Sequence, residues 1–323
     1  MTVTRNFPQG QSMHVALVQK ATLGEGLAWH AATARWWWTD IQASNLYAWE
    51  PQQQAPVRLI APDRVGSFAH CRSGRLLLGL SKQLCFAELP DLNELGSRQL
   101  QVEFLSAVDA AEPRTRINDG RTDRSGNFVF GTMNEGDDKR PIGSFYQYSQ
   151  RHGLRRLALP AVSIANSICF SPDGTTLYFC DTRTQTIMQC DYDAESAQVA
   201  HIRLFCSMDQ QHAYPDGSIV DSTGFLWNAQ WGAGRVVQYS PEGRLIRSIT
   251  VPTKNPTCPA FGGAHLDELC VTSSRQEMSA QEFKSMPHAG SLFAMSIPGT
   301  TGINDALFDD RSTITHTTPR SKP

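Results

Sequence analysis

Five acidic or amide side chains stand beside glycine or small apolar residues, where charged and polar groups are unusual. Glu25 lies in the segment LGEGL, Asn118 and Asp119 in RINDG, Asn166 in IANSI, and Asp216 in YPDGS. Carboxylate and amide oxygens are hard ligands that suit Ca²⁺, Mg²⁺ or Mn²⁺ and, with less discrimination, Zn²⁺. Each residue also has a simpler interpretation, because Asp-Gly pairs are common in turns and a glutamate between glycines is typical of a solvated loop. Together, they could form a cation site.

Several other kinds of catalytic site are excluded by missing motifs. The sequence contains no GxSxG nucleophile elbow, no HExxH zinc motif and no GxxxxGK[ST] phosphate-binding loop. The run from Gly232 to Gly234 lacks the third glycine of a dinucleotide-binding fingerprint, and we interpret it as a hairpin turn. The oxygen-bearing residues are therefore the main candidates for chemistry.

A weak internal repeat indicates the elements that must position these residues. A polar turn, usually with glycine, precedes a short apolar strand, a polar break and a second strand that ends in an aromatic residue. The clearest copy begins with SPDG at 171–174, and the six copies begin near residues 31, 71, 123, 171, 221 and 267. A recurrence of roughly 40 to 50 residues is the length of a four-stranded propeller blade. The repeat favours an all-β, six-bladed β-propeller, while two stacked sandwiches remain an alternative.

The chain shows no shift in composition that would mark a domain boundary. We therefore predict one domain over residues 1–323, with a loose C-terminal tail at about 312–323 that is rich in Thr, Ser and Pro. The best candidate for a helix, near residues 279–285, is short and lies in the sixth repeat. In a propeller the innermost strands line a central channel. Equivalent residues of different blades can therefore meet near the axis and form the cation site.

Composition narrows the class of protein further. The 323 residues are 40% hydrophobic and 19% charged, with a net charge of −2, and no basic stripe suits a nucleic acid. No apolar stretch approaches the roughly 20 residues that span a bilayer, and residues 1–17 lack the apolar core of a signal peptide. We expect a cytoplasmic protein with no nucleic-acid or membrane partner. The eight cysteines form no CxxC pair and several lie in apolar runs, which favours reduced, buried thiols over disulfides.

The ordered set of segments resembles the gluconolactonase, senescence-marker-protein and regucalcin-like family, over nearly the whole chain. Each segment alone is weak, but the set in this order is specific. The matching segments are LGEGLAW at 23–29, WTDI at 38–41, RINDG at 116–120, Asp123, GTM at 131–133, Asn166, SPDG at 171–174, LY at 177–178, Asp181, PDG at 215–217, Asp221, Gly224, LW at 226–227, GRV at 234–236, Thr257, FGG at 261–263 and LCVT at 269–272.

This resemblance implies a six-bladed propeller with one divalent cation (Ca²⁺, Zn²⁺, Mg²⁺, Mn²⁺ or Fe²⁺) in the central channel. The implied metal ligands are Glu25, Asn166 and Asp216, and Asp216 is also the implied general base. Arg116 and Asn118 are implied to meet the oxygens of the substrate, with Asn118 near the metal. The implied function is a metal-dependent sugar lactone hydrolase that opens an aldonolactone, such as glucono-, galactono- or arabinonolactone, to the aldonic acid.

Two departures from the family pattern affect the predicted site. The family usually has glycine after the metal-binding asparagine, whereas this chain has Ser167, whose backbone must avoid or tolerate conformations open to glycine. Family members also carry acids after the Gly-Thr-Met segment that reach the sugar, and here that segment continues with Asn-Glu-Gly. Glu135 is therefore a candidate substrate contact, and a solvated loop residue is its alternative interpretation.

Two other functions remain open from the sequence. One is a Ca²⁺-binding regulatory protein without enzymatic activity, a role also attributed to this family. The other is an interaction platform, for which the triplet Trp36, Trp37 and Trp38 would form an exposed patch; its alternation favours packing between blades instead. The predicted partner is a small-molecule sugar lactone, and the sequence leaves a monomer and a weak dimer both possible.

Overall fold

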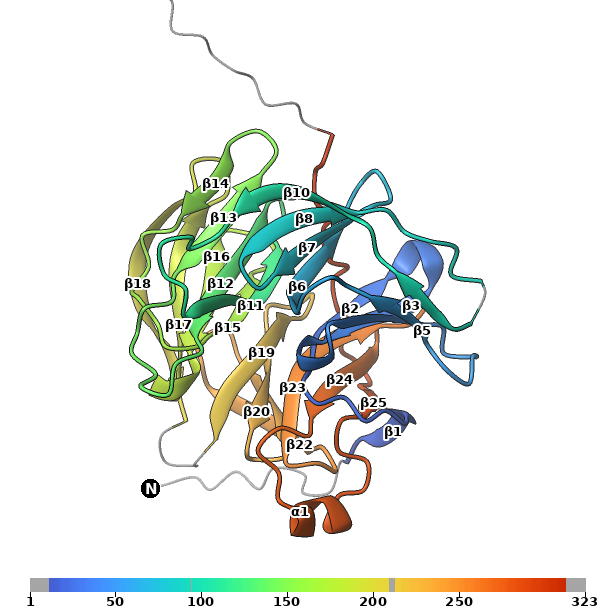
Figure 1. Ribbon diagram of the computed structural model, residues 1–323. Coiled ribbons are helices and arrows are strands. Elements are labelled where there is room, and N and C mark those ends of the chain that lie inside the picture. Colours follow the sequence, from blue (N-terminus) through green and yellow to red (C-terminus); the bar gives the residue numbers. More distant parts are fainter. Residues whose placement is uncertain (1–11, 94, 209–212, 312–323) are drawn as a thin grey trace, which may run out of the picture.

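Six β-sheets stand around a common axis in the computed structural model, which describes residues 12–93, 95–208 and 213–311 (Figure 1). Five sheets have four strands and one has five. The predicted six-bladed β-propeller is therefore confirmed, and the alternative of two stacked sandwiches is wrong. The predicted tail at 312–323 lies outside the described residues, and one domain over the whole chain stays a prediction.

The first three blades, numbered in chain order, are built mainly from consecutive strands, except that β9 joins blade 1 after the first three strands of blade 2. Blade 1 contains β2 (Gly24–His30), β3 (Arg35–Asp40), β4 (Asn45–Trp49), β5 (Val57–Ile60) and β9 (Ser97–Gln99). Blade 2 contains β6 (Val65–His70), β7 (Leu76–Leu80), β8 (Gln83–Ala87) and β10 (Val102–Ala107). Blade 3 contains β11 (Thr115–Thr122), β12 (Phe128–Asn134), β13 (Phe145–Ser149) and β14 (Gly153–Arg156). Among the strands of the described residues, β9 alone pairs with its neighbour in parallel, along the outer edge of β5.

The last three blades complete the ring, and the sixth is shared by the two ends of the described chain. Blade 4 contains β15 (Ala165–Phe170), β16 (Thr176–Asp181), β17 (Thr186–Asp193) and β18 (Gln198–Ser207). Blade 5 contains β19 (Tyr214–Val220), β20 (Leu226–Trp231), β21 (Arg235–Tyr239) and β22 (Leu245–Thr250). Blade 6 contains β23 (Asn255–Gly262), β24 (Glu268–Ser274), β25 (Leu292–Ser296) and β1 (His14–Leu17). Because β1 is the outer strand of blade 6, it ties the beginning of the ring to its end.

The hydrophobic core is divided into six clusters, one between each pair of neighbouring blades. Alternation along each strand sends successive side chains to opposite faces of a blade. Trp37 therefore packs against blade 2, whereas Trp36 and Trp38 pack against blade 6. All three indoles are at most 1% exposed. The prediction that this triplet packs between blades is confirmed, and its interpretation as an exposed patch is wrong.

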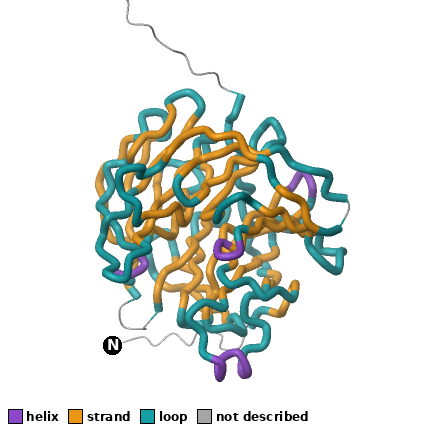
Figure 2. The backbone as a smooth tube through the Cα atoms, in the orientation of Figure 1, coloured by secondary structure: helices purple, strands orange, loops and turns teal. Residues whose placement is uncertain are grey.

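Helical structure is sparse and peripheral (Figure 2). The described helix α1 (Ala280–Ser285) lies between β24 and β25, where the sequence predicted a short helix. It is capped by reciprocal hydrogen bonds between Ser279 and Glu282. Three short 3₁₀ turns are η1 (Ala31–Thr33), η2 (Ile41–Ala43) and η3 (Thr182–Thr184). None of the helices in the described ranges is long and apolar enough to cross a membrane.

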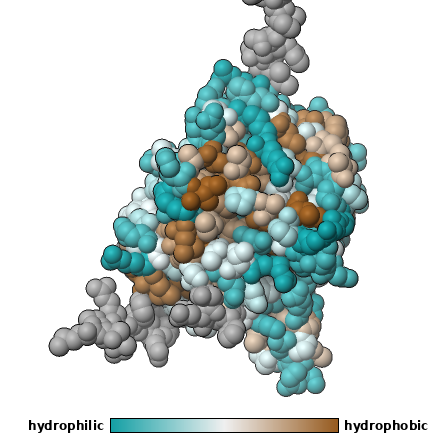
Figure 3. Space-filling view, turned by 90° about the vertical axis from the view of Figure 1, so that its left-hand side faces the viewer, coloured by the Kyte–Doolittle hydropathy of each residue, from teal (hydrophilic) through white to brown (hydrophobic). Residues whose placement is uncertain are grey.

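Some of the exposed large hydrophobic residues lie on outer strands of the blades. Figure 3 shows the side of the molecule that lies at the left of Figure 1, where hydrophobic patches are interspersed with hydrophilic residues. Ile202 and Leu204 of β18, the outer strand of blade 4, are among the exposed large hydrophobic residues. All eight cysteines are free and buried, which confirms the expectation of reduced thiols.

Candidate active site

The innermost strand of every blade carries an irregularity in its pairing at a corresponding position. The register shifts in β2, β6, β11, β15, β19 and β23, in each case within the first half or the middle of the strand. Such bulges bend a strand and redirect its side chains. Glu25, Asn118, Asn166 and Asp216 all lie at or within these bulges. The bulges, rather than simple strand alternation, therefore position the predicted site residues.

These six inner strands also form a closed ring. Each contacts the next in the order β2, β6, β11, β15, β19 and β23, and β23 contacts β2. Residues that are distant in the sequence consequently face one another across the channel, which is the convergence that the propeller prediction required.

The carboxyl groups of Glu25 and Asp216 meet in this channel. Both residues are buried, and their side chains are hydrogen-bonded to each other. Burial raises the pKa of Glu25 to about 8, and the neighbouring Asp119 carboxylate adds to this shift. Burial and the charges of Glu25 and Asp119 raise the pKa of Asp216 well above its ordinary value. When both carboxyl groups are ionised, this pair places excess negative charge in a buried site. The site therefore favours the binding of either a proton or a cation.

Asp119 is a third carboxylate of the channel, partly buried, and its place is fixed by the backbone of the next blade. One of its oxygens, Oδ2, accepts a hydrogen bond from the Ile168 amide at 2.8 Å. Burial raises the pKa of Asp119 as well, although its backbone hydrogen bonds and the charge of Arg121 act in the opposite direction. The sequence placed Asp119 in a candidate segment but gave it no role. Because an Asp-Gly dipeptide is typical of turns, the sequence did not distinguish Asp119 from an ordinary turn residue.

Two amide side chains form the neighbouring side of the site. Nδ2 of Asn118 donates to Oδ1 of Asn166 at 3.2 Å and to the carbonyl of Ala165 at 2.9 Å. Nδ2 of Asn166 donates to Oγ1 of Thr182 at 2.9 Å, and this hydroxyl in turn donates to the carbonyl of Pro215 at 2.9 Å. Thr182 therefore fixes the orientation of the Asn166 amide, with Nδ2 toward Thr182 and Oδ1 toward Asn118.

Arg116 connects these amides to Glu135. Its Nη1 donates to Oδ1 of Asn118 at 2.7 Å, and its Nε lies 3.3 Å from Oε1 of Glu135. Burial lowers the pKa of Arg116 to about 10, so the guanidinium remains charged at neutral pH. Arg64 binds the same carboxylate with two nitrogens, at 2.5 and 2.8 Å. Although burial opposes them, these two guanidinium groups lower the pKa of Glu135.

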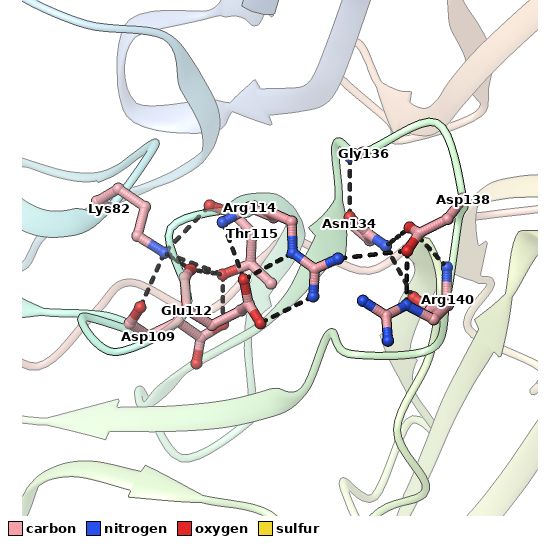
Figure 4. Close-up of polar contacts among 9 residues, drawn as sticks. All are labelled: Lys82, Asp109, Glu112, Arg114, Thr115, Asn134, Gly136, Asp138 and Arg140. Atoms are coloured by element: carbon pink, nitrogen blue, oxygen red, sulfur yellow. Dashed lines mark hydrogen bonds and ion pairs between the residues drawn. The ribbon is translucent and has the colours of Figure 1, made fainter.

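The loop that precedes β11 is fastened by Lys82, which lies in the turn between β7 and β8 (Figure 4). Its ammonium group donates to the carbonyls of Asp109, Glu112 and Thr115 and to the hydroxyl of Thr115, at 2.9 to 3.1 Å. Four acceptors around one ammonium group hold the loop in a single conformation. Lys82 thereby fixes the start of the strand that carries Arg116.

The segment that carries Glu135 is fastened in a similar way. Asp138 accepts hydrogen bonds from Nδ2 of Asn134 at 2.8 Å and from Nε of Arg140 at 2.5 Å (Figure 4). Nη1 of Arg114 reaches the same carboxylate at 3.3 Å from the loop before β11. These contacts join the two segments that supply Arg116 and Glu135, so that both side chains keep a fixed relation at the partly exposed edge of the site.

The residues present fit a hard divalent cation by their chemistry. Glu25 and Asp216 supply buried carboxylates whose charges lack a full compensating partner, and Asn166 supplies an amide oxygen. Within the described ranges, no three His, Cys, Asp or Glu residues are grouped so that they could hold a metal ion. An ion bound here would therefore need the Asn166 oxygen beside the two carboxylates. Glu25, Asn166 and Asp216 are the residues that would hold it.

A cavity of about 250 Å³ lies along the second halves of β2, β6 and β11, beyond the candidate ligands. Trp29, Phe68 and Arg121 contribute to its walls, and it reaches Asp119. Residues 304–307 form another wall, where Asp305 binds Nη1 of Arg121 at 2.6 and 2.8 Å. Glu25, Asn166 and Asp216 are not among the residues that line this cavity.

The structure thus brings most of the predicted residues into direct contact. Glu25 meets Asp216, Asn118 links Asn166 to Arg116, and Arg116 meets Glu135. Their roles toward metal and substrate stay predictions. Sequence reasoning missed Arg64, because an arginine in the loop between β5 and β6 carries no motif that distinguishes it from other surface arginines.

Comparisons with known proteins give a consistent result. Residues 23–275 match the family described as the SMP-30/Gluconolactonase/LRE-like region. The L-arabinolactonase of Azospirillum brasilense is 40% identical over 288 residues, which cover 88% of this chain and 92% of that protein. The 6-deoxy-6-sulfogluconolactonase of Pseudomonas putida is 30% identical over 293 residues, which cover 90% and 97%. The crystal structure of regucalcin from Agrobacterium tumefaciens strain C58, described as a calcium-binding protein, has a TM-score of 0.84 and 29% identity and covers 92% of this chain and 97% of that one.

Proposed function

Because the chain belongs to the SMP-30/gluconolactonase/LRE-like family, we propose that it is a metal-dependent sugar lactone hydrolase that opens an aldonolactone to the aldonic acid. Two of the relatives named above are lactonases, which supports the enzyme class of the carboxylic ester hydrolases. The observation that carries the proposal is the buried pair of Glu25 and Asp216 beside Arg116 and Asn118. This arrangement places acid–base groups, cation ligands and a hydrogen-bond donor together.

Among the aldonolactones, we favour an arabinonolactone as the substrate. The support is the 40% identity to a protein named for L-arabinolactone hydrolysis, over 92% of that protein's length. A neutral, polyhydroxylated ring also suits a site edge with two guanidinium groups around one carboxylate. There, Arg116 can donate to ring or carbonyl oxygens while Glu135 accepts from hydroxyl groups.

Asp216 is the proposed general base. It would accept a proton from the attacking water and return it to the departing ring oxygen, which is ordinary acid–base work for a carboxylate. A divalent cation bound to Glu25, Asn166 and Asp216 would supply Lewis acidity toward the ester carbonyl. The set of oxygen ligands suits Ca²⁺, Mg²⁺, Mn²⁺ or Zn²⁺, and Fe²⁺ is a further candidate for the ion.

Arg116 and Asn118 are proposed to bind and orient the lactone. The 2.7 Å hydrogen bond between them fixes the guanidinium group, which retains donors for the substrate. Asn118 stands between Arg116 and Asn166, so it connects the substrate-binding side to the cation ligands. Glu135, held by Arg64, would then recognise hydroxyl groups at the edge of the site.

A Ca²⁺-binding regulatory protein without enzymatic activity is the second candidate. It is favoured by the similarity to the regucalcin from Agrobacterium tumefaciens, which is described as calcium-binding. The same three oxygen ligands would serve such a role. Turnover that is supported by several divalent ions would favour the enzyme, whereas selective Ca²⁺ binding without turnover would favour the regulatory protein.

We also propose that the chain forms one domain and works in the cytoplasm. The support for one domain is the ring of six blades that β1 closes. The support for the cytoplasm is that all eight cysteines are free, since free thiols are typical of reducing compartments.

The test of the proposed function is proton release at constant pH. Metal-stripped protein would receive arabinono-, galactono- and gluconolactones, with Ca²⁺, Mg²⁺, Mn²⁺, Zn²⁺ and Fe²⁺ added in turn. We expect at least one pair of ion and lactone to restore hydrolysis far above the spontaneous rate. If no pair does so while the protein remains folded, the lactonase proposal is wrong.

A further inference from the structure

Ser167 occupies a position at which a side chain is energetically costly. It follows Asn166 in the bulge of β15, has a φ of +61° and is completely buried. Residues other than glycine rarely adopt this left-handed conformation, because their Cβ atom crowds the backbone. A serine that persists at such a site needs a compensating interaction of its side chain, and the surroundings of its hydroxyl group supply one.

The Ser167 hydroxyl group lies in a buried polar cluster around the bulge of β19. It donates to the carbonyl oxygen of Asp216 at 2.6 Å and accepts from the Ser218 hydroxyl at 3.1 Å. Nδ2 of Asn228 lies 3.3 Å from Ser167 Oγ, 3.1 Å from the Asp216 carbonyl and 3.2 Å from the Gly217 carbonyl. The hydroxyl group therefore bridges the bulge of blade 4 to the bulge of blade 5.

The far side of the β19 bulge is packed tightly as well. A Cβ atom at Gly217 would lie 2.9 Å from the Thr257 carbonyl oxygen and 2.9 Å from the Cα of Cys258, so β23 abuts this turn. The bulge that carries Asp216 is thus held between β23 on one side and the Ser167 hydroxyl group on the other. Its position depends on both contacts.

We infer that Ser167 is a positioning residue whose hydroxyl group fixes the backbone of Asp216 relative to Asn166. Ser167 adjoins one proposed cation ligand in sequence and binds the backbone of another through space. Groups that orient metal ligands commonly affect metal affinity or activity by about 10- to 100-fold. The inference rests on the proposed function and assigns to this serine a role that glycine, which lacks a side chain, cannot perform.

Two substitutions separate this role from a purely structural one. Ser167→Gly removes the hydroxyl group and relieves the left-handed strain, whereas Ser167→Ala removes the hydroxyl group and keeps the strain. We expect both variants to bind Ca²⁺ or Mn²⁺ about 10- to 100-fold more weakly in calorimetric titrations of metal-free protein. We expect kcat for lactone hydrolysis to fall in both, while Ser167→Gly melts at a higher temperature than Ser167→Ala.

A matched control is available at Ser44, which also has a positive φ, of +53°, and ends the turn η2 in blade 1. Ser44→Gly relieves the same kind of backbone strain far from the β15 and β19 bulges. We expect it to leave both metal affinity and kcat unchanged, so that loss of function in the Ser167 variants is attributable to the missing hydroxyl group.

The inference is overturned if Ser167→Gly keeps the metal affinity and kcat of the unmodified protein. It is also overturned if the losses follow melting temperature, with Ser167→Ala affected far more than Ser167→Gly. An unmodified protein that binds a cation but hydrolyses no lactone would refute the proposed function alone. The metal affinities of the Ser167 variants would in that case still decide the role of Ser167.

Discussion

Replacing Glu25 by glutamine should stabilise the metal-free protein at high pH. In the fold, burial and the nearby Asp119 raise the pKa of Glu25 from 4.5 to about 8. Between these values the unfolded chain releases the proton of this carboxyl group while the folded, metal-free protein retains it. The unfolded state then binds fewer protons, so the free energy of unfolding falls as the pH rises through this window.

The magnitude follows from the two pKa values. Their difference of about 3.5 pKa units lowers the free energy of unfolding by at most about 5 kcal/mol at pH 8. Well below pH 4.5 it has no effect on stability. Glutamine has no proton to exchange and also removes one negative neighbour of Asp216. We therefore expect the free energy of unfolding of metal-free Glu25→Gln to exceed that of the unmodified protein by about 2 to 5 kcal/mol at pH 8. At pH 4 the two free energies should differ little.

The assay is urea unfolding in the presence of a chelator, at several pH values from 4 to 8. Glu88→Gln is the control, because the Glu88 side chain is 81% exposed and lies outside the channel, so this substitution should not raise the free energy of unfolding at pH 8. Divalent metal should reduce the advantage of Glu25→Gln, since a ligand at 100 times its Kd adds about 2.7 kcal/mol to the free energy of unfolding of the protein that binds it. The reasoning is refuted if metal-free Glu25→Gln is no more stable than the unmodified protein at pH 8.

Three further substitutions test individual roles. Asp216→Asn removes the proposed base and should lower kcat by about 10²- to 10⁴-fold in a proton-release assay; an unchanged kcat would exclude Asp216 as the base. Arg116→Ala should lower kcat/KM by about 10- to 100-fold, because a hydrogen bond to a charged group contributes about 1.5 to 3 kcal/mol. Its metal content, measured by mass spectrometry, should not change, and loss of metal would contradict a role limited to substrate. Arg64→Ala leaves Glu135 with one guanidinium partner and should raise KM up to about 5-fold, since a partly exposed ion pair contributes at most about 1 kcal/mol; a large fall in kcat instead would place Arg64 in the chemistry.

The propeller could be predicted from the sequence because its blades are local. Each blade is built mainly from consecutive strands joined by short turns, so the repeat of turn and strand is visible in the chain itself. The alternation of Trp36, Trp37 and Trp38 likewise predicted their packing, because neighbouring side chains on a strand face opposite neighbours. In contrast, the parallel addition of β9 to blade 1 depends on a contact across about 40 residues, and no local pattern marks it.

The site was only partly predictable, for the same physical reason. Glu25, Asn166 and Asp216 were identified through a resemblance, whereas their common placement at bulges of the inner strands became visible only in the structure. Arg64 reaches Glu135 across 71 positions in the sequence, and the Ser167 hydroxyl group reaches Asp216 across 49. Such contacts depend on how the blades are arranged around the axis, which composition and spacing do not encode.

The most direct test of the central claim is a parallel titration of metal-free protein, in which the heat of cation binding and the rate of arabinonolactone hydrolysis are followed together. The proposed site predicts that both signals saturate at one equivalent of ion per chain and that both are lost in Glu25→Ala and Asp216→Ala. Undiminished hydrolysis by metal-free protein, or normal binding and turnover in both variants, would contradict it.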